Sequence, residues 1–152
     1  MEETPVGPND MGWRISAVHQ QRLPWLVCEG NQGRVIGFAY ATPFRKRTGF
    51  RYTVETKVYL EPRITGRGVG ALLYQQLIDQ LNGTSYRAAM SCIGLPDDAS
   101  VKLLEKIGFR QVGLLRSVGY KFDRWVDVSY WQLMLNQIAI DDGEISFRQQ
   151  SP

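Results

Sequence analysis

The chain has 152 residues, of which 43% are hydrophobic and 22% charged, and its formal net charge is +3. This composition is typical of one folded domain and excludes global disorder, and no apolar run reaches the roughly 20 residues that a membrane span needs. The acidic, proline-containing residues 1–10 do not have the pattern of a signal peptide.

Hydrophobic spacing and turn residues predict helices and strands in a mixed order. After a loose lead-in at residues 1–11, we expect helices at 12–22, 71–81 and 100–107, and strands at 25–29, 35–41, 52–60, 87–93, 111–120 and 126–135. This order predicts a mixed α/β sheet whose last two strands form an antiparallel pair, rather than an alternating doubly wound fold. We expect residues 1–135 to form a single domain and residues 136–152 a polar C-terminal tail.

The chain contains one histidine, His19, and two cysteines, Cys28 and Cys92. This supply is too small for a zinc site or a Ser-His-Asp triad, so we expect no metal. Two thiols in apolar, strand-like segments do not form a disulfide framework, and they favour a reducing compartment, the cytoplasm.

Basic residues gather before the third predicted strand, at Arg45, Lys46, Arg47 and Arg51. Such a cluster fits a polyanionic partner, either nucleic acid or a phosphate-rich small molecule, although a solvated face is the commoner explanation for charge alone. The sequence has no known RNA- or DNA-binding motif, and its aromatic residues are not interleaved with arginine. We therefore expect neither nucleic acid nor a membrane as a partner.

Residues 65–70, with the sequence TGRGVG, stand at the sharpest transition in the chain, between a predicted strand and a predicted helix. Glycines let the backbone approach a ligand closely, and the free N–H groups at a helix start form an anion site together with the helix dipole. The segment is not a Walker loop, because no Gly-Lys-Ser/Thr follows, and it lacks the acidic residue of a dinucleotide fingerprint. For the glycines alone, a tight turn without a ligand is an equal alternative.

Further segments stand in a fixed order around this turn, with a β-rich strand before it and a helix ended by Gly108-Phe109 after it. In this order the chain resembles the GNAT superfamily of N-acetyltransferases and, within it, the phosphinothricin/methionine sulfoximine acetyltransferase branch. The resemblance covers residues 4–135 and is carried by segments 23–27, 37–41, 53–60, 93–96 and 115–127. It implies a largely antiparallel, twisted sheet flanked by helices. The family begins with a strand and a helix before the segment that matches Thr4, and this chain is expected to lack both.

The resemblance implies an acetyl-CoA-dependent N-acetyltransferase that modifies the amine of a small amino acid or an analogue of the phosphinothricin or methionine sulfoximine type. Coenzyme A is a polyanion with a long, amide-bearing arm, which suits a strand edge, helix-start amides and a basic rim. The residues implied to bind it are Val58, Tyr59, Leu60, Gly66, Arg67, Gly68, Val69, Gly70, Ala71, Asp97 and Lys106. For Arg67 and Lys106, solvated surface charge is an equal alternative.

Glu55 is the residue expected to move a proton. A carboxylate in the middle of an otherwise apolar strand is costly to bury without a reason, and the resemblance places the family's proposed general base at this position. Only a neutral amine attacks a thioester, so a carboxylate beside it can take the proton. The alternative is an exposed edge charge paired with Lys57 or Arg51.

The remaining catalytic groups are less well defined by the residues. The resemblance implies a backbone N–H of residues 58–60 as the oxyanion donor. Leu104 stands where many superfamily members have a tyrosine, so the acid for the leaving thiolate is unassigned. Tyr59 and Tyr120 are candidates, although buried tyrosines are more often structural.

Residues 44–50 match the family's acceptor loop, and Arg45, Arg47 and Phe50 are implied to bind the acceptor. A guanidinium binds a carboxylate or a phosphinate through two hydrogen bonds, and the aromatic ring can line a side-chain pocket. A mobile basic loop is the alternative. Trp125 and Asp127 also match family positions, although a core tryptophan and a turn aspartate explain them as well.

Two side chains depart from the family pattern. Thr65 stands where Arg or Gln is usual, and Asp97 replaces an Asn that contacts coenzyme A. Together with the missing start, these departures leave an alternative open: an N-terminally shortened, inactive or weakly active member that acts as a cofactor-binding or interaction module. The resemblance also implies a homodimer.

Overall fold

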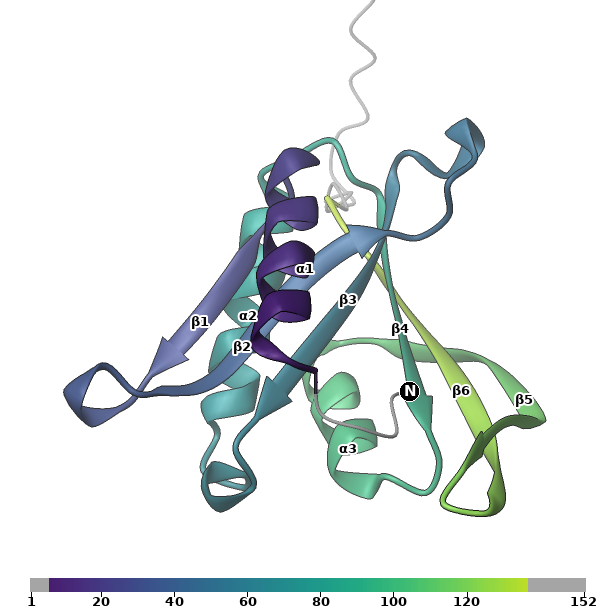
Figure 1. Cartoon of the computed structure of the whole chain (residues 1–152). Helices are drawn as coiled ribbons and strands as arrows, with labels where there is room; N and C mark the ends of the chain where they lie inside the picture. Colours follow the sequence, from purple (N-terminus) through teal and green to yellow (C-terminus); the bar gives the residue numbers. More distant parts are fainter. Residues whose placement is uncertain (1–5, 137–152) are drawn as a thin grey trace, which may run out of the picture.

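The computed structural model describes residues 6–136 (Figure 1). In chain order, its helices and strands are α1 (Pro8–Gln20), β1 (Trp25–Glu29), β2 (Val35–Pro43), β3 (Thr53–Leu60), α2 (Val69–Asn82), β4 (Ala88–Gly94), α3 (Asp98–Ile107), β5 (Arg110–Lys121) and β6 (Arg124–Met134). The strands form one sheet in the order β1-β2-β3-β4-β6-β5, in which only β3 and β4 run parallel. The predicted mixed, largely antiparallel sheet flanked by helices is confirmed.

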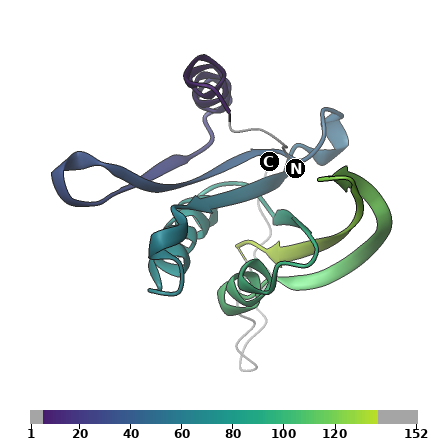
Figure 2. The same ribbon diagram turned by 60° about the horizontal axis from the view of Figure 1, so that its bottom comes forward.

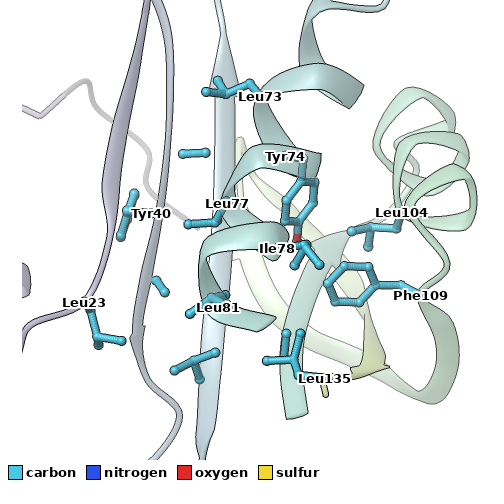
Figure 3. Close-up of a cluster of buried hydrophobic side chains, with 14 of the residues drawn as sticks. Leu23, Tyr40, Leu73, Tyr74, Leu77, Ile78, Leu81, Leu104, Phe109 and Leu135 are labelled. Atoms are coloured by element: carbon cyan, nitrogen blue, oxygen red, sulfur yellow. The ribbon is translucent and has the colours of Figure 1, made fainter. Parts of the chain in front are cut away.

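The sheet lies between helices, with α1 on one face and α2 and α3 on the other (Figure 2). Leucines of α2 recur at helical spacing, and Leu77 and Leu81 are fully buried against the sheet. In Figure 3, Tyr74 of α2 lies close to Phe109, and their ring centroids are 5.5 Å apart. The core is therefore concentrated around α2, and this packing fixes the position of the glycine turn that leads into the helix.

Helix α1 begins at Pro8, before the predicted start at residue 12. Proline suits the first turn of a helix because its missing N–H would have no partner there, and Asp10 places a negative charge near the positive end of the helix dipole. The prediction of a loose lead-in is therefore wrong for residues 8–11. The other predicted helices and strands are present with small shifts of their boundaries.

Strands β3 and β4 run side by side over a short distance and then separate (Figure 1). Their ladder pairs residues 53–55 with residues 88–90 and goes no further. At the point of separation, the buried Thr56 hydroxyl donates to the Met90 carbonyl oxygen at 3.1 Å and shares a 2.7 Å hydrogen bond with the Tyr74 hydroxyl. The sheet therefore opens between its third and fourth strands, above α2 and α3.

Two glycines let the end of β3 pack closely on its neighbours. A Cβ atom added at Gly37 would lie 2.6 Å from Leu60 Cδ2 and 2.9 Å from the Tyr59 carbonyl oxygen. A Cβ atom added at Gly70 would lie 2.7 Å from Leu60 Cδ1. Leu60 thus fills the space that side chains would need at both positions, and it joins the end of β3 to the start of α2.

We expect Gly37→Ala to lower the free energy of unfolding by about 1–3 kcal/mol, because the new methyl group must displace a backbone oxygen as well as a leucine methyl. Gly12→Ala is the matched control, because an added Cβ inside α1 meets nothing within 4 Å. This control should gain about 0.5–1 kcal/mol from the better helix propensity of alanine. Thermal unfolding followed by circular dichroism tests both, and an unchanged Tm for Gly37→Ala would contradict the close packing.

The described chain ends at Asn136, which is hydrogen-bonded to the rest of the fold. The Asn136 side chain donates to the carbonyl oxygens of Thr84 and Tyr86, each at 2.8 Å, in the connection between α2 and β4. The rest of the expected polar tail lies outside the described residues. Within residues 6–136, no helix is long and apolar enough to cross a membrane, and no three potential metal ligands cluster.

Candidate active site

The separation of β3 and β4 leaves an open cavity of about 860 Å³. Its walls come from the separated strand ends, the start of α3 and the β5–β6 hairpin. Lys57, Val58 and Tyr59 of β3 line it together with Cys92 of β4 and Asp97 before α3. Three residues predicted to bind acetyl-CoA, at positions 58, 59 and 97, therefore share one cavity.

The two separated strands offer backbone groups to this cavity. β3 pairs with β2 as far as Leu60, and β4 pairs with β6 as far as Gly94, but the ladder between β3 and β4 stops at Glu55 and Met90. Beyond that point, the edges of β3 and β4 that face each other pair with no other strand within residues 6–136. An extended ligand with its own amide groups can pair with such an edge as an added strand would.

Glu55 lies where the strands separate, on the sheet face opposite to Thr56 and α2. Its Oε1 atom is 3.4 Å from Lys57 Nζ and 3.9 Å from Cys92 Sγ, and its side chain is 21% exposed. Lys57 and Cys92 both line the cavity, so the carboxylate, which is not itself a lining residue, lies next to the cavity wall. The pairing with Lys57 that the sequence left open also forms, at this same position.

The Glu55 carboxylate raises the pKa of two neighbouring side chains, those of Lys57 and Cys92. Burial lowers the pKa of Lys57, but the Glu55 carboxylate and the hydroxyls of Tyr40 and Tyr59 more than offset burial, so this pKa lies above its ordinary value. Burial and the same carboxylate raise the pKa of the Cys92 thiol. At neutral pH Lys57 is therefore an ammonium and Cys92 a neutral thiol.

Tyr74 of α2 and Thr56 of β3 are buried, hydrogen-bonded to each other and part of the cavity lining. Burial raises the pKa of Tyr74 to about 12, so its hydroxyl stays neutral at physiological pH. Because this pKa exceeds the ordinary value of 10.0, the resulting stability is complete below pH 10.0 and is lost as the pH rises toward about 12. Tyr74 therefore ties α2 to β3 as a neutral hydrogen-bonding group.

The predicted anion-binding turn, residues 66–71, leads into α2, whose first residues have no side-chain cap. Gly66 and Gly68 have φ angles of 79° and 80°, which glycine adopts without strain, and an added Cβ at either would meet no atom within 4 Å. The turn therefore leaves open space beside Gly66 and Gly68, and no side chain caps the N–H groups at the start of α2, where an anion could bind. None of residues 66–71 lines the cavity, and the turn reaches the end of β3 through Leu60 packed on Gly70.

The other residues predicted to bind acetyl-CoA have different surroundings. Asp97 caps α3, since its Oδ1 accepts from Ser100 N at 3.0 Å and its Oδ2 from the Ser100 hydroxyl at 2.7 Å. Arg67 and Lys106 are exposed and do not line the cavity. Leu104 is buried and lines the cavity, where it offers no proton.

The predicted acceptor residues Arg45, Arg47 and Phe50 lie in the β2–β3 loop, beyond the end of β3 that is distant from the cavity (Figure 1). The Arg45 guanidinium lies 4.2 Å from the centre of the Phe44 ring, and Phe50 meets the same ring edge-on at 5.9 Å. None of the three predicted residues lines the cavity. The structure therefore does not place them in the cavity wall, and their role stays a prediction.

A comparison with protein families bears on this arrangement of cavity, carboxylate and glycine turn. The sequence model of the Acetyltransferase (GNAT) family matches residues 2–109. The chain belongs to the GNAT family. The matched range includes Glu55, the glycine turn and α3, so the GNAT match covers most of the site described above.

Two named acetyltransferases and one acetyltransferase structure are similar to this GNAT chain over most of its length. It is 42% identical to a phosphinothricin N-acetyltransferase from Streptomyces viridochromogenes, over 74% of this chain and 61% of that protein. It is 38% identical to an L-methionine sulfoximine/L-methionine sulfone acetyltransferase from Salmonella typhimurium, over 78% of this chain and 69% of that protein. The crystal structure of a GNAT superfamily phosphinothricin acetyltransferase from Sinorhizobium meliloti in complex with AcCoA matches with a TM-score of 0.84 at 35% identity, over 88% of this chain and 72% of that one. The chain thus spans less than two thirds of the Streptomyces protein.

The β5–β6 hairpin of this GNAT domain corrects one interpretation of the sequence. Trp125 is not a core residue, because it is 67% exposed and contacts Tyr120 edge-on with ring centroids 5.2 Å apart. Tyr120 is itself exposed and does not line the cavity. Of the two tyrosines considered as the acid, only Tyr59 lines it.

Asp127 is a strand residue of β6 rather than a turn residue. Its Oδ1 accepts from Ser117 N and its Oδ2 from the Arg116 guanidinium, both at 2.8 Å. The Ser117 N–H and the Arg116 guanidinium hold the pKa of Asp127 below its ordinary value. This carboxylate therefore fastens an irregular segment of β5, where the pairing with β6 shifts between Leu115 and Gly119.

Lys57, Cys92 and Tyr74 belong to the site although sequence reasoning assigned none of them to it. Lys57 carries a usable signal, because it stands two residues after the predicted base and residues two apart on a strand share a face. Cys92 and Tyr74 reach the cavity only because β4 and α2 pack beside β3. Short-range spacing contains no signal for such contacts.

We expect Glu55→Gln to speed the alkylation of Cys92 by iodoacetamide several-fold at mildly alkaline pH. Removing the carboxylate lowers the thiol pKa, which increases the fraction of reactive thiolate. Cys28 of β1 does not line the cavity and serves as the internal control. Peptide mass spectrometry measures both rates, and equal Cys92 rates in the two proteins would show that the carboxylate does not influence the thiol.

Proposed function

We propose that the chain is an acetyl-CoA-dependent N-acetyltransferase that acts on the amine of a small amino acid or analogue, of the phosphinothricin or methionine sulfoximine type. The position of Glu55 carries this proposal: a partly buried carboxylate at the point where two parallel strands separate, beside an open cavity. The names of the two relatives support the acceptor class, and the AcCoA-bound relative supports the acyl donor.

The residues present fit acetyl-CoA. The edge of β3 at residues 58–60 offers backbone groups to the pantetheine arm, and the uncapped start of α2, with Val69, Gly70 and Ala71, offers N–H groups to the diphosphate. Arg67 adds positive charge within the turn itself, and Lys106 of α3 stays a proposed contact of the polyanion. Asp97 fits least well, because its carboxylate repels phosphate, although its two hydrogen bonds with Ser100 spread that charge.

In this proposal different residues of the chain carry out the separate steps of the acetyl transfer. Acetyl-CoA, when bound, supplies an acetyl group activated as a thioester. Glu55 accepts a proton from the acceptor ammonium, directly or through a water molecule, and the freed amine attacks the carbonyl carbon. Backbone N–H groups of residues 58–60 donate to the carbonyl oxygen as negative charge develops there. As the C–S bond breaks, Tyr59 gives a proton to the leaving thiolate, and the second proton of the acceptor nitrogen passes through water to restore the Tyr59 hydroxyl.

Arg45, Arg47 and Phe50 remain our proposed acceptor contacts in the β2–β3 loop. The loop leaves the sheet close to the base, because Thr42 of β2 pairs directly with Glu55. The two guanidinium groups suit the charged oxygens of a phosphinate or a carboxylate, and the Phe50 ring suits an apolar side chain.

Titration calorimetry with acetyl-CoA, followed by a thiol-release assay, tests the proposed function. The acceptor panel is phosphinothricin, methionine sulfoximine, methionine sulfone and the proteinogenic amino acids. Binding together with thiol release for at least one acceptor is the expected result. Binding without release on the whole panel would favour a cofactor-binding module instead, and no binding would overturn the proposal.

We further propose a homodimer formed through the β5–β6 hairpin, where β5 is an edge strand. This hairpin exposes large apolar side chains, which in folded proteins often mark a contact with another chain. Those that do not line the cavity are Val112, Leu114, Tyr120, Trp125 and Met134. Light scattering should give twice the mass of one chain, and a monomer would contradict this.

Both described cysteines are free thiols, which supports a cytoplasmic location, and we propose no nucleic acid or membrane partner.

A further inference from the structure

Lys57 stands beside the proposed base, and the mechanism above gives it no role. Its ammonium nitrogen is 3.4 Å from Glu55 Oε1, and its side chain is 38% exposed at the cavity wall. It pairs across the ladder with Tyr40 of β2, whose ring stacks on Trp25. A packed aromatic pair thus lies next to the stem of Lys57, on the same face of the sheet as Glu55.

The Lys57 ammonium beside the proposed base affects which amines can bind next to Glu55. Near neutral pH an aliphatic amine arrives as an ammonium and must reach the Glu55 oxygen that Lys57 already contacts. Two ammonium groups at one carboxylate repel each other, which disfavours a simple amine. An α-amino acid carries a carboxylate on the carbon next to its amine, so it can neutralise Lys57 while its ammonium pairs with Glu55.

We propose that Lys57 binds the α-carboxylate of the acceptor and thereby selects zwitterionic amino acids over amines that lack this group. The inference rests on the proposed function, because it names the acceptor subsite of that reaction. On binding, one ion pair between Glu55 and Lys57 is replaced by two, ammonium with Glu55 and carboxylate with Lys57. The net charge of the site is unchanged, and no buried charge loses its partner.

The other cations of the chain are less suited to this task. Arg45 and Arg47 do not line the cavity, and Arg45 lies over the Phe44 ring. Lys121 and Arg124 line the cavity from the β5–β6 hairpin, whereas the ion pair with Glu55 is made by Lys57. The arginines of the β2–β3 loop are then left for the charged or polar end of the acceptor side chain.

The test is a binding measurement that needs no turnover. L-Methionine sulfone and its α-carboxamide are titrated by calorimetry into protein saturated with coenzyme A, which lacks the acetyl group. The native chain should bind the acid at least about tenfold more tightly than the amide. Lys57→Met should weaken binding of the acid about tenfold and should not weaken binding of the amide, which no longer meets a second ammonium, and Lys57→Arg should restore most of the preference. Lys102→Met, which removes an exposed charge on α3, should behave as the native chain.

Two results would overturn the inference. One is a native chain that binds acid and amide equally or binds neither, and the other is a Lys57→Met variant that keeps the preference. Loss of the preference in Arg45→Met or Arg47→Met, with Lys57→Met unaffected, would place the carboxylate in the loop instead. Failure of the proposed function looks different: the native chain would release no thiol with any acceptor, while its Lys57-dependent binding of methionine sulfone would persist.

Discussion

Glu55→Gln is expected to lower the turnover number by about 10²-fold or more and to leave the dissociation constant of acetyl-CoA within about twofold of the native value. Glutamine keeps the size of the side chain but cannot accept the proton of the acceptor ammonium. Binding of acetyl-CoA should survive, because Glu55 does not itself line the cavity. Steady-state kinetics and calorimetry measure the two quantities separately.

The control for this variant is Glu29→Gln, which removes an exposed carboxylate at the end of β1 and should keep native turnover. The residual rate of Glu55→Gln should rise with pH, because at higher pH the acceptor amine loses its proton to water without help from the protein. Native turnover in Glu55→Gln would mean that another group removes the proton, and the proposed mechanism would then be wrong.

Gly68→Asp is expected to weaken acetyl-CoA binding about tenfold more than Gly68→Asn does. Aspartate and asparagine have the same shape, and both tolerate a positive φ better than most residues. An added Cβ at position 68 meets no atom within 4 Å, so neither variant is excluded by sterics. The two variants therefore differ in one negative charge at the uncapped start of α2, where we place the diphosphate.

S-Acetylpantetheine separates charge repulsion from a general disturbance of the turn, because it lacks the diphosphate. It should bind the Gly68→Asp and Gly68→Asn proteins with equal affinity. If both ligands lose the same affinity in Gly68→Asp, the turn does not contact the diphosphate, and the anion site must be sought elsewhere on the chain.

The predicted helices and strands follow largely from local residue patterns. The spacing of Leu73, Leu77 and Leu81 predicts α2, and these side chains are the buried face of that helix. Gly108 predicts the end of α3 and adopts a φ of 103° there. The start of α1 is harder to predict, because the polar composition around Pro8 and Asp10 outweighs their helix-starting signal.

Exposure in the β5–β6 hairpin could not be predicted in the same way. Trp125 and Tyr120 belong to apolar, strand-forming segments that suggest a core, yet both are more than half exposed. Whether such a face is covered depends on which element packs against it. In this sheet β5 is an edge strand, and α2 and α3 cover the other strands more fully.

Local order along the chain predicts the helices, the strands and the glycine turn, and the order of these segments over residues 4–135 carries the resemblance to the GNAT family that singles out Glu55. The cavity, the contact of Glu55 with Cys92 and the floor formed by Thr56 and Tyr74 depend on folding. They arise where the parallel ladder of β3 and β4 stops at Glu55 and Met90. The point at which two strands part is set by the helices and strands packed around them, and no spacing within either strand encodes it.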